Sequence, residues 1–244
     1  TFRPLCYDYI RILPDYKSGI IKFMKNIPRI FISNDIAPGI ILPAPSDTVH
    51  YLRHVMRRGD FLTFANGHEF TATLSDDNKT IVVGACTSHD DPSNDITLMF
   101  SPIKRTDDLL NMATQMGVRA FVPVIMERTV ASHINWNRMQ KIVIEASEQS
   151  NRNSVPEIMP PVRFSDMDLS DIVFADERCA YGTKLPTTAH GATKILIGPE
   201  GGFSQSEFSA LDNSGAIGIS LGKTILRAEL AAAVAISRIT LQEK

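Results

Sequence analysis

Two stretches near the end of the chain combine residue types that can hold a small ligand, IGPEGGFS at 197–204 and SLGKTILRAE at 220–229. Each follows a short apolar run and opens a segment of helical pattern, which places both at strand ends. Glycine lets a backbone approach a ligand closely and adopt positive φ, whereas proline stiffens a loop. In open α/β sheets, ligands bind outside the carboxyl ends of the strands. Two such loops on neighbouring strands predict a rigid cup whose main-chain groups contact a planar, uncharged heterocycle.

The spacing of the glycines excludes two other ligand-binding motifs. Gly222-Lys223-Thr224 resembles the end of the phosphate-binding loop G-x-x-x-x-G-K-[ST], but the first glycine of that motif would fall at Ile217. The dinucleotide fingerprint G-x-G-x-x-G is not matched by Gly198, Gly201 and Gly202. A plain turn is the alternative for any single glycine loop. Two loops of this kind, each opening a helix, favour a ligand site.

Two charged residues in these stretches are candidates for chemistry. Arg227 begins a helix beside the second glycine loop. Its guanidinium can stabilise negative charge that develops on a substrate, or it can form an ion pair with Glu200 or Glu229. Glu200 can act as a base, or its carboxylate can accept backbone N–H groups near a helix start. We favour the second role for Glu200, and we expect no histidine to be catalytic.

The elements that must position these loops follow from hydrophobic patterning. The continuous apolar runs are ITLMFS, AFVPVI, DIVFA, KILI and IGISL, all after residue 95. Such runs are typical of a parallel sheet that is covered on both faces. Helices are predicted at 107–116, 136–150, 204–213 and 226–241, with Ser204 and Glu207 forming a capping box. This alternation predicts an α/β fold with a largely parallel sheet.

The first third of the chain has a different pattern. The short runs RIFIS, DFLTFAN, EFTATLS and TIVVGAC are separated by turn residues and predict a small β-barrel. One helix is predicted from Ser46, as its N-cap, to about Arg58. The polar stretch HDDPSND at 89–95 marks a domain boundary. We therefore expect a barrel at 28–91 and an α/β domain at 96–244, after an N-terminal extension at 1–27. Met24 opens a natural start, so residues 1–23 are expected to be upstream or non-native sequence.

Composition places the chain among ordinary globular proteins. The formal net charge is −2, although residues 1–60 contain nine Lys or Arg and five Asp or Glu. This imbalance permits a basic N-terminal surface. Cys6, Cys86 and Cys179 lie far apart, which predicts no zinc site or disulfide framework and fits a reducing cytosol. Neither a membrane span nor a signal peptide is evident, so we expect a cytoplasmic protein without a metal or membrane partner.

The two glycine stretches together carry a resemblance to a known family. IGPEGGFSQSEF followed by SLGKTILRAELA closely resembles the paired motifs of the SPOUT methyltransferases that modify N3 of a uridine in small-subunit (16S) ribosomal RNA. The resemblance covers about residues 28–240 and includes PRIFIS, HYLRHVMRRGD, KRTDDLLNMATQMGV and IEASEQSNRNSVPEI. It implies a PUA-like barrel, a SPOUT domain with a deep trefoil knot, and a homodimer. It also implies S-adenosylmethionine (SAM) as methyl donor and ribosomal RNA or the assembled 30S subunit as partner.

The family motifs assign site residues by position. The resemblance implies that the cofactor contacts are Ile197, Gly198, Pro199, Glu200, Gly201, Leu221, Gly222, Ile225, Leu226 and Arg227. Arg227 and Glu200 are the catalytic candidates. One departure is Leu230, where the family usually has threonine, and this puts any role of that hydroxyl in doubt.

Several cations are expected to contact RNA. They are Arg29, Arg53, Arg57, Arg58, Lys104, Arg105 and Arg152. Three of them recur at helical spacing in YLRHVMRRGD and can meet phosphates, although a solvated helix face is the alternative for such a run.

Two other functions remain open beside uridine-N3 methylation. The same domain can modify tRNA or another ribosomal RNA site, and the departure at Leu230 allows an RNA-binding assembly factor without catalysis.

Overall fold

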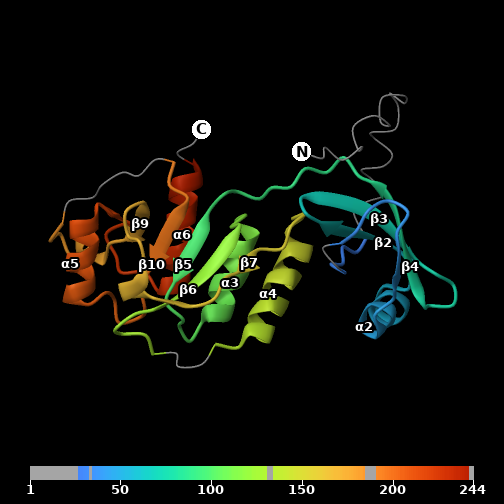
Figure 1. Cartoon of the computed structure of the whole chain (residues 1–244), viewed down its shortest axis with the longest axis horizontal. Coiled ribbons are helices and arrows are strands. Elements are labelled where there is room, and N and C mark those ends of the chain that lie inside the picture. Colours follow the sequence, from blue (N-terminus) through green and yellow to red (C-terminus); the bar gives the residue numbers. More distant parts are fainter. Residues whose placement is uncertain (1–26, 33–34, 131–133, 185–190, 242–244) are drawn as a thin grey trace. The chain divides into compact units, whose positions relative to one another are not determined.

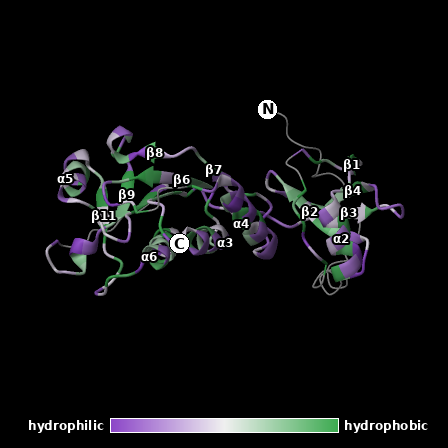
Figure 2. Cartoon of the chain, turned by 90° about the horizontal axis from the view of Figure 1, so that it is seen from below, coloured by the Kyte–Doolittle hydropathy of each residue, from purple (hydrophilic) through white to green (hydrophobic). Residues whose placement is uncertain are grey.

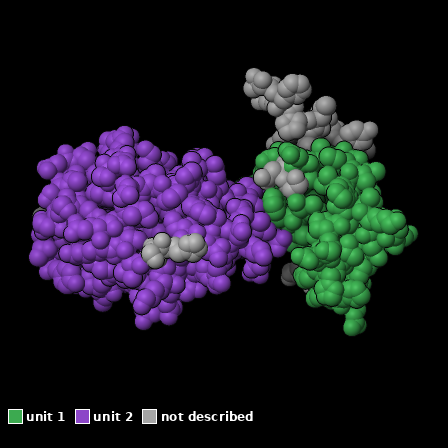
Figure 3. Space-filling model, turned by 60° about the horizontal axis from the view of Figure 1, so that its bottom comes forward, with its two compact units in different colours: residues 1–91 green, residues 92–244 purple. Residues whose placement is uncertain are grey.

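The computed structural model describes residues 27–32, 35–130, 134–184 and 191–241. The prediction about residues 1–23 lies outside the described residues. The chain divides into two compact units, unit 1 at residues 1–91 and unit 2 at residues 92–244 (Figure 3). The division falls inside the proline-bearing stretch 89–95, where polar residues and a proline interrupt the strand pattern.

Unit 1 contains an antiparallel sheet of four strands (Figure 1). The strands are β1 (Ile41–Pro43), β2 (Asp60–Ala65), β3 (His68–Leu74) and β4 (Thr80–Cys86), in the order β1-β4-β3-β2. The run RIFIS is not a strand in its described part, because Arg29 forms only an isolated parallel bridge with Leu62. The short strand β1 was not predicted. The described strands form an open order, so closure into a barrel stays a prediction.

The helix of unit 1 has a different start from the predicted one. Helix α2 (Ser46–His50) continues as the π-helical segment η2 (Tyr51–Met56). Pro45 occupies the N-cap position and Ser46 is already helical, so the predicted cap at Ser46 is wrong. The segment ends at Arg57, whose backbone is left-handed with φ of 54°. Leu52 is the residue of this helix that is buried in the core of unit 1.

Unit 2 is an α/β unit with a parallel sheet, as predicted. Its strands are β5 (Thr97–Phe100), β6 (Ala120–Ile125), β7 (Glu157–Ile158), β8 (Val162–Arg163), β9 (Ile172–Ala175), β10 (Lys194–Ile197) and β11 (Ile217–Ile219). Their order is β11-β9-β10-β5-β6-β7, with β8 also paired to β6, and all these pairs are parallel. The short strands β7 and β8 were not predicted, since runs of two residues have no readable period.

Four helices and two 3-10 turns complete the described part of unit 2. The helices are α3 (Thr106–Gln115), α4 (Trp136–Gln149), α5 (Gln205–Ser214) and α6 (Ala228–Leu241). The turns are η3 (Phe164–Asp166) and η4 (Glu177–Cys179). Helix α6 starts at Ala228, two residues later than predicted, so residues 225–227 belong to the preceding loop. No helix among the described residues is long and apolar enough to cross a membrane.

Both faces of the central strands are buried, which explains their continuous apolar runs. In β10, Ile195 and Ile197 belong to the core shared with α3, α4 and α6, whereas Leu196 belongs to the core shared with α5. In β9, Val173 and Phe174 alternate between the same two cores. In Figure 2 hydrophobic residues run along strands such as β6, while helices α4 and α5 also carry hydrophilic ones. This two-sided packing leaves the strand ends as the place for a site.

The predicted capping box fixes the start of α5 directly after the first glycine loop. Ser204 Oγ accepts the N–H of Glu207 at 3.3 Å, and Glu207 Oε2 accepts the N–H of Ser204 at 2.8 Å. Both side chains are buried. A capping box satisfies two backbone donors that a helix start otherwise leaves without partners. The loop at 198–203 is therefore held at both ends, by β10 and by α5.

Candidate functional site

A cavity of about 470 Å³ lies in unit 2 at the carboxyl ends of β9 and β10 and beside the loop after β11. This volume is within the range of small-molecule sites, ~300–1,000 Å³. Its lining includes all but one of the predicted cofactor contacts, namely Ile197, Gly198, Pro199, Glu200, Leu221, Gly222, Ile225, Leu226 and Arg227. The exception is Gly201. Sequence reasoning therefore located both loops, and the structure brings them together around one cavity.

The two glycine loops do not follow neighbouring strands, contrary to the prediction. Strand β9 lies between β10 and β11 in the sheet. As a result, the residues that follow β9 also line the cavity, including Asp176, Glu177 and Ala180. Sequence reasoning missed these residues. The signal was present, because the acids of ADER follow a predicted parallel strand at the end where ligands bind.

Glycine is required in the first loop because neighbouring groups come very close to its backbone. A Cβ at Gly198 would lie 3.0 Å from the ring of Phe203. Gly202 has φ of +69°, and a Cβ there would clash with the carboxylate of Glu177. The N–H of Gly202 donates to the carbonyl of Pro199 at 2.9 Å, which closes the turn. The loop is therefore a tight, defined backbone cradle.

Arg128, after β6, binds the outer side of this loop. Its Nη1 donates to the carbonyl of Gly201 at 2.9 Å and to that of Phe203 at 3.2 Å. The adjacent N–H of Glu127 donates to Glu207 at 2.9 Å, which joins the same segment to the start of α5. Gly201 lies against Arg128 and outside the cavity lining. The prediction that Gly201 contacts the cofactor therefore has no support in the geometry.

Glu200 has the architectural contact expected for it. Its Oε1 accepts the backbone N–H of Lys104 at 3.2 Å. Lys104 follows β5, the strand that pairs with β10, so this bond links two adjacent strand ends. Lys104 and Arg105, which were predicted to contact RNA, also line the cavity and are exposed. These two cations therefore lie beside the glycine loops.

Arg227 lines the cavity immediately before α6 and is exposed. Its carbonyl accepts the N–H of Ala231 at 2.8 Å, which starts the helix. The alternative ion pairs with Glu200 and Glu229 are not formed within the described part of the chain. Arg105 lies near Glu229 instead, with 3.8 Å between Nε and Oε1. The geometry thus leaves the Arg227 guanidinium available for a ligand.

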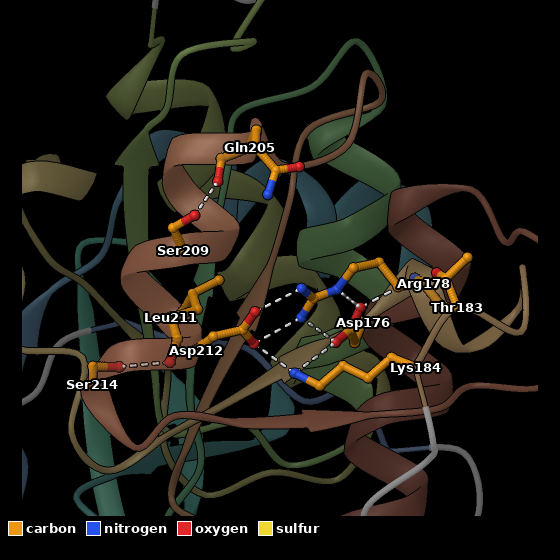
Figure 4. A network of polar contacts seen from close by, with 9 residues as sticks. All are labelled: Asp176, Arg178, Thr183, Lys184, Gln205, Ser209, Leu211, Asp212 and Ser214. Carbon is orange, nitrogen blue, oxygen red and sulfur yellow. Dashed lines mark hydrogen bonds and ion pairs between the residues drawn. The ribbon is translucent and has the colours of Figure 1, made fainter.

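A network of charges anchors the turn after β9 (Figure 4). The buried carboxylate of Asp176 accepts hydrogen bonds from Arg178 Nε at 2.9 Å and Nη2 at 2.7 Å. Arg178 also donates to Asp212 of α5 at 2.8 and 2.9 Å. Lys184 donates to the same Asp212 at 2.5 Å. These bonds raise the pKa of Arg178 above its ordinary value and lower that of Asp212. The network ties turn η4 to α5.

Glu177 is the residue of this turn whose carboxylate faces the glycine loop. It lines the cavity, is half-buried, and approaches the backbone of Gly202 closely. Burial raises its pKa above the ordinary value, and the negative charge of Asp176 acts in the same direction. Arg128 and Arg178 offset part of this shift. Among the described residues, its side chain has no hydrogen-bond or ion-pair partner.

Two predicted RNA contacts, the buried Arg152 and the partly buried Arg29, bind other groups of the fold. Arg152 is only 1% exposed and its Nη1 donates to the carbonyls of Thr114 and Val118 at 2.9 and 2.7 Å. Arg29 forms an ion pair with Glu69 at 2.8 Å, and its side chain is 8% exposed. Both guanidinium groups are largely shielded from solvent. These contacts give no support to an RNA-binding role for Arg152 or Arg29, which stays a prediction.

The other three predicted contacts of unit 1 lie on its surface. Arg53 donates to Asn78 at 2.6 Å and to the carbonyl of Ser75 at 3.1 Å, which secures the turn between β3 and β4. Arg58 pairs with Asp60. Arg57 is exposed at the end of η2. Arg57 is therefore the strongest of the three as an RNA contact.

No group of three or more His, Cys, Asp or Glu side chains in the described ranges could hold a metal ion.

Comparison with known proteins shows which family this chain resembles in sequence. Residues 90–240 match the family model of the RNA methyltransferase domain. The chain is 31% identical over 231 residues to ribosomal RNA small subunit methyltransferase E of Rickettsia conorii, covering 87% of this chain and 95% of that protein.

Solved structures agree with this match. The crystal structure of ribosomal RNA small subunit methyltransferase E from Neisseria gonorrhoeae, bound to S-adenosyl methionine, superposes with a TM-score of 0.73 at 29% identity. The match covers 89% of this chain and 97% of that one. A probable rRNA-methyltransferase from Porphyromonas gingivalis superposes with a TM-score of 0.71 at 26% identity, covering 86% and 96%.

Proposed function

The chain belongs to the RNA methyltransferase domain family, and on this basis we propose that it transfers a methyl group from SAM to N3 of a uridine in small-subunit ribosomal RNA. The observation that supports this most is the cavity enclosed by the two glycine loops. It has the size of a cofactor site and opens beside exposed cations. The relatives named ribosomal RNA small subunit methyltransferase E favour ribosomal RNA as the substrate.

The chemistry of the cavity fits SAM. Ile197, Leu221 and Leu226 provide apolar walls for an adenine ring, and the tight backbone at Gly198 and Gly202 leaves main-chain groups next to the cavity. Acidic side chains on the β9 side suit a cofactor that carries hydroxyl and ammonium donors and a positive sulfonium. The carboxylate of Glu177 would repel a ligand phosphate placed directly beside it. The residues present therefore fit the proposed cofactor.

In the proposed reaction, the bound cofactor supplies an electrophilic methyl carbon on its sulfonium. The protein aligns the uracil N3 for in-line displacement, in which the new nitrogen–carbon bond forms as the carbon–sulfur bond breaks. N3 gives its imide proton to water, and negative charge spreads to the two flanking carbonyl oxygens. The Arg227 guanidinium can stabilise that charge, because it lines the cavity without an ion-pair partner among the described residues. Arg227 is our catalytic assignment.

Glu200 has a different role in this proposal. Its carboxylate accepts a backbone N–H from Lys104, and this contact holds the glycine loop against the loop after β5. We therefore assign Glu200 to the architecture of the cofactor site and not to proton transfer. This assignment agrees with the sequence analysis, which favoured a role for Glu200 as an acceptor of backbone N–H groups.

We propose two separate sets of RNA contacts, Lys104, Arg105 and Arg227 in unit 2 and Arg57 in unit 1. The first three surround the cavity, where phosphates can fix the register of a strand whose target base is displaced. Arg57 is exposed on the π-helical segment and can meet phosphates of a neighbouring region. Binding through these cations predicts a strong dependence of affinity on salt.

The remaining family properties are part of the same proposal. We propose that residues 96–244 form a SPOUT domain with a trefoil knot and that residues 28–91 form a PUA-like barrel. We also propose a homodimer, supported by the exposed apolar side chains of Ile225 (54% exposed), just before α6, and Leu230 (47% exposed), in its first turn. A ribosomal RNA substrate would place the reaction in the cytoplasm.

The departure at Leu230 has little bearing on the cofactor. Leu230 does not line the cavity, although its neighbours Glu229 and Ala231 do. The observation that made a non-catalytic assembly factor plausible therefore lies outside the proposed cofactor contacts. Modification of tRNA or another ribosomal RNA site remains the alternative to be separated by experiment.

The decisive experiment measures methylated nucleosides. Ribosomal RNA and tRNA from a strain without the gene should be incubated with the protein and SAM, as naked RNA and as 30S subunits. The expected result is 3-methyluridine in small-subunit RNA, with loss of a primer-extension stop at one uridine in the disrupted strain. Methylation of tRNA alone would favour the alternative enzyme. No transfer to any RNA, together with no heat of SAM binding, would contradict the proposal.

A further inference from the structure

We propose that Glu177 is a cofactor-recognition residue, whose carboxylate accepts a hydrogen bond from a donor group of the bound nucleoside cofactor. This inference rests on the proposed function and adds a contact that the glycine motifs do not contain. Two groups of SAM can supply the donor, the ribose hydroxyls and the α-ammonium. Both donate hydrogen bonds to a carboxylate, the hydroxyls as neutral groups and the ammonium as a cation, and the experiment below separates them.

The first argument is the position of Glu177 at the carboxyl end of a sheet strand, in the turn after β9. Turn η4 follows β9, which lies between the strands that precede the two glycine loops. Its residue Glu177 therefore reaches the cavity from a third side. Its Oε1 is the atom that a Cβ on Gly202 would strike, so the carboxylate lies directly against the glycine loop. A ligand in the cavity that reaches this loop also reaches Glu177.

The turn is held rigidly, which is the second argument. The N–H of Asp176 donates to the carbonyl of Ile219 in β11 at 3.0 Å, and the N–H of Cys179 donates back to Asp176 at 3.2 Å. Arg178 binds Asp176 on one side and Asp212 on the other (Figure 4). Neighbours on both sides of Glu177 are therefore fixed. Ligand binding therefore does not need to order the backbone of this turn.

The third argument is electrostatic. A half-buried carboxylate without a hydrogen-bond partner in the described ranges is unfavourable, since desolvation of an anion costs free energy unless donors compensate. The negative charge of the adjacent Asp176 disfavours ionised Glu177. The positive charges of Arg128, after β6, and Arg178, in η4, favour it. Lys184 faces Asp176 at 3.5 Å. Donors of a ligand would remove the remaining penalty, and ligand phosphates would increase it.

The test is calorimetry of S-adenosylhomocysteine, the demethylated cofactor, with the full chain and Glu177→Gln. The variant should bind about tenfold or more weakly, because a hydrogen bond to a charged acceptor becomes a neutral one. Glu145→Gln is the matched control, as Glu145 is exposed on α4 and does not line the cavity. Unchanged affinity in a folded Glu177→Gln chain would overturn the proposal.

A second ligand identifies the donor. 5′-Methylthioadenosine retains the ribose and the adenine but lacks the amino acid. A loss of affinity for both ligands in Glu177→Gln assigns the contact to the ribose hydroxyls, and a loss for S-adenosylhomocysteine alone assigns it to the α-ammonium. Loss for neither ligand is the overturning result. If the unaltered chain binds neither ligand, the proposed cofactor itself is wrong, and this outcome is distinct from the failure of Glu177.

The unaltered chain gives an independent readout if Glu177→Gln does not fold. Ligand donors favour the ionised carboxylate, so binding should release protons from the fraction of Glu177 that is protonated. Affinity for S-adenosylhomocysteine should therefore fall as the pH decreases from ~7 to ~4, an interval that includes the ordinary pKa of a glutamate and the range above it. Constant affinity across this interval in the unaltered chain would contradict the contact.

Discussion

The carboxylate of Glu200 accepts the backbone N–H of Lys104 at 3.2 Å, and this bond joins the loop after β10 to the loop after β5. It supports the proposal that Glu200 holds the loop and does not transfer a proton. The same bond also separates two roles experimentally, because a glutamine can accept an N–H but cannot take a proton from a substrate.

We expect Glu200→Gln to retain most of the methyl-transfer rate and Glu200→Ala to lose about five- to tenfold in cofactor affinity. The amide oxygen of glutamine preserves the bond to Lys104, whereas alanine leaves that N–H to solvent at a cost of about 1 kcal/mol. Methyl transfer to 30S subunits and calorimetry with S-adenosylhomocysteine measure the two effects. Equal loss of turnover in both variants would instead assign Glu200 to proton transfer.

Arg227→Ala should lower turnover by about 100-fold or more while cofactor affinity changes little. Its guanidinium is proposed to stabilise charge that exists only during transfer, and removal of such a group affects kcat more than binding. Arg238→Ala is the control, because Arg238 is exposed on α6 and does not line the cavity. Normal single-turnover rates in Arg227→Ala would exclude this arginine from the mechanism.

Gly202→Ala should destabilise the chain more than Gly215→Ala. Both glycines have positive φ, +69° and +86°, so both substitutions introduce backbone strain of about 1 kcal/mol. A Cβ at Gly215 has no atom within 4 Å, but one at Gly202 clashes with Glu177. Urea unfolding of each variant measures the difference.

Combining Gly202→Ala with Glu177→Ala provides the control for this clash. The double variant should recover the excess destabilisation, since the strained backbone remains but the opposing carboxylate is gone. If Gly202→Ala and Gly215→Ala are equally destabilised, the close approach of Glu177 to the glycine loop is not significant for stability.

Arg152→Met should reduce stability by about 2–3 kcal/mol and leave RNA affinity unchanged in the folded protein. The substitution removes the donor from two buried carbonyls, those of Thr114 and Val118, and their desolvation is then uncompensated. Arg57→Ala should do the opposite, with unchanged stability and a weaker, less salt-dependent RNA affinity. Filter binding at several salt concentrations, together with urea unfolding, distinguishes the two arginines.

Asp212→Asn should lower the unfolding temperature at neutral pH but have a smaller effect in acid. Hydrogen bonds from Arg178 and Lys184 hold the pKa of Asp212 below its ordinary value. The carboxylate therefore stabilises the folded state above that ordinary value, and this stabilisation is lost as the pH falls through the lowered pKa. Thermal unfolding of both chains at pH ~7 and pH ~2, well below the ordinary pKa of an aspartate, gives the comparison. A difference between the chains that is independent of pH would contradict the charged network.

The sequence by itself determined the α/β class, the parallel sheet and both loops of the cavity. Continuous apolar runs identified the central strands because both faces of those strands are buried, and Ser204 with Glu207 identified the start of α5. Glycine and proline located the loops, since the conformations required there are local properties of the backbone. Local signals were not sufficient at every element, since the predicted N-cap at Ser46 is occupied by Pro45 and the run RIFIS is not a strand in its described part.

Tertiary structure alone decided which strand lies between the two loops and which charges are buried. Strand order is not local, and the insertion of β9 between β10 and β11 is what brings Glu177 to the cavity. Burial is equally nonlocal: Arg152 and Arg57 are both arginines near a helix end, yet one donates to buried carbonyls and the other is exposed. Charge and spacing specify what a side chain can do, and the packing around it determines whether a ligand can reach it.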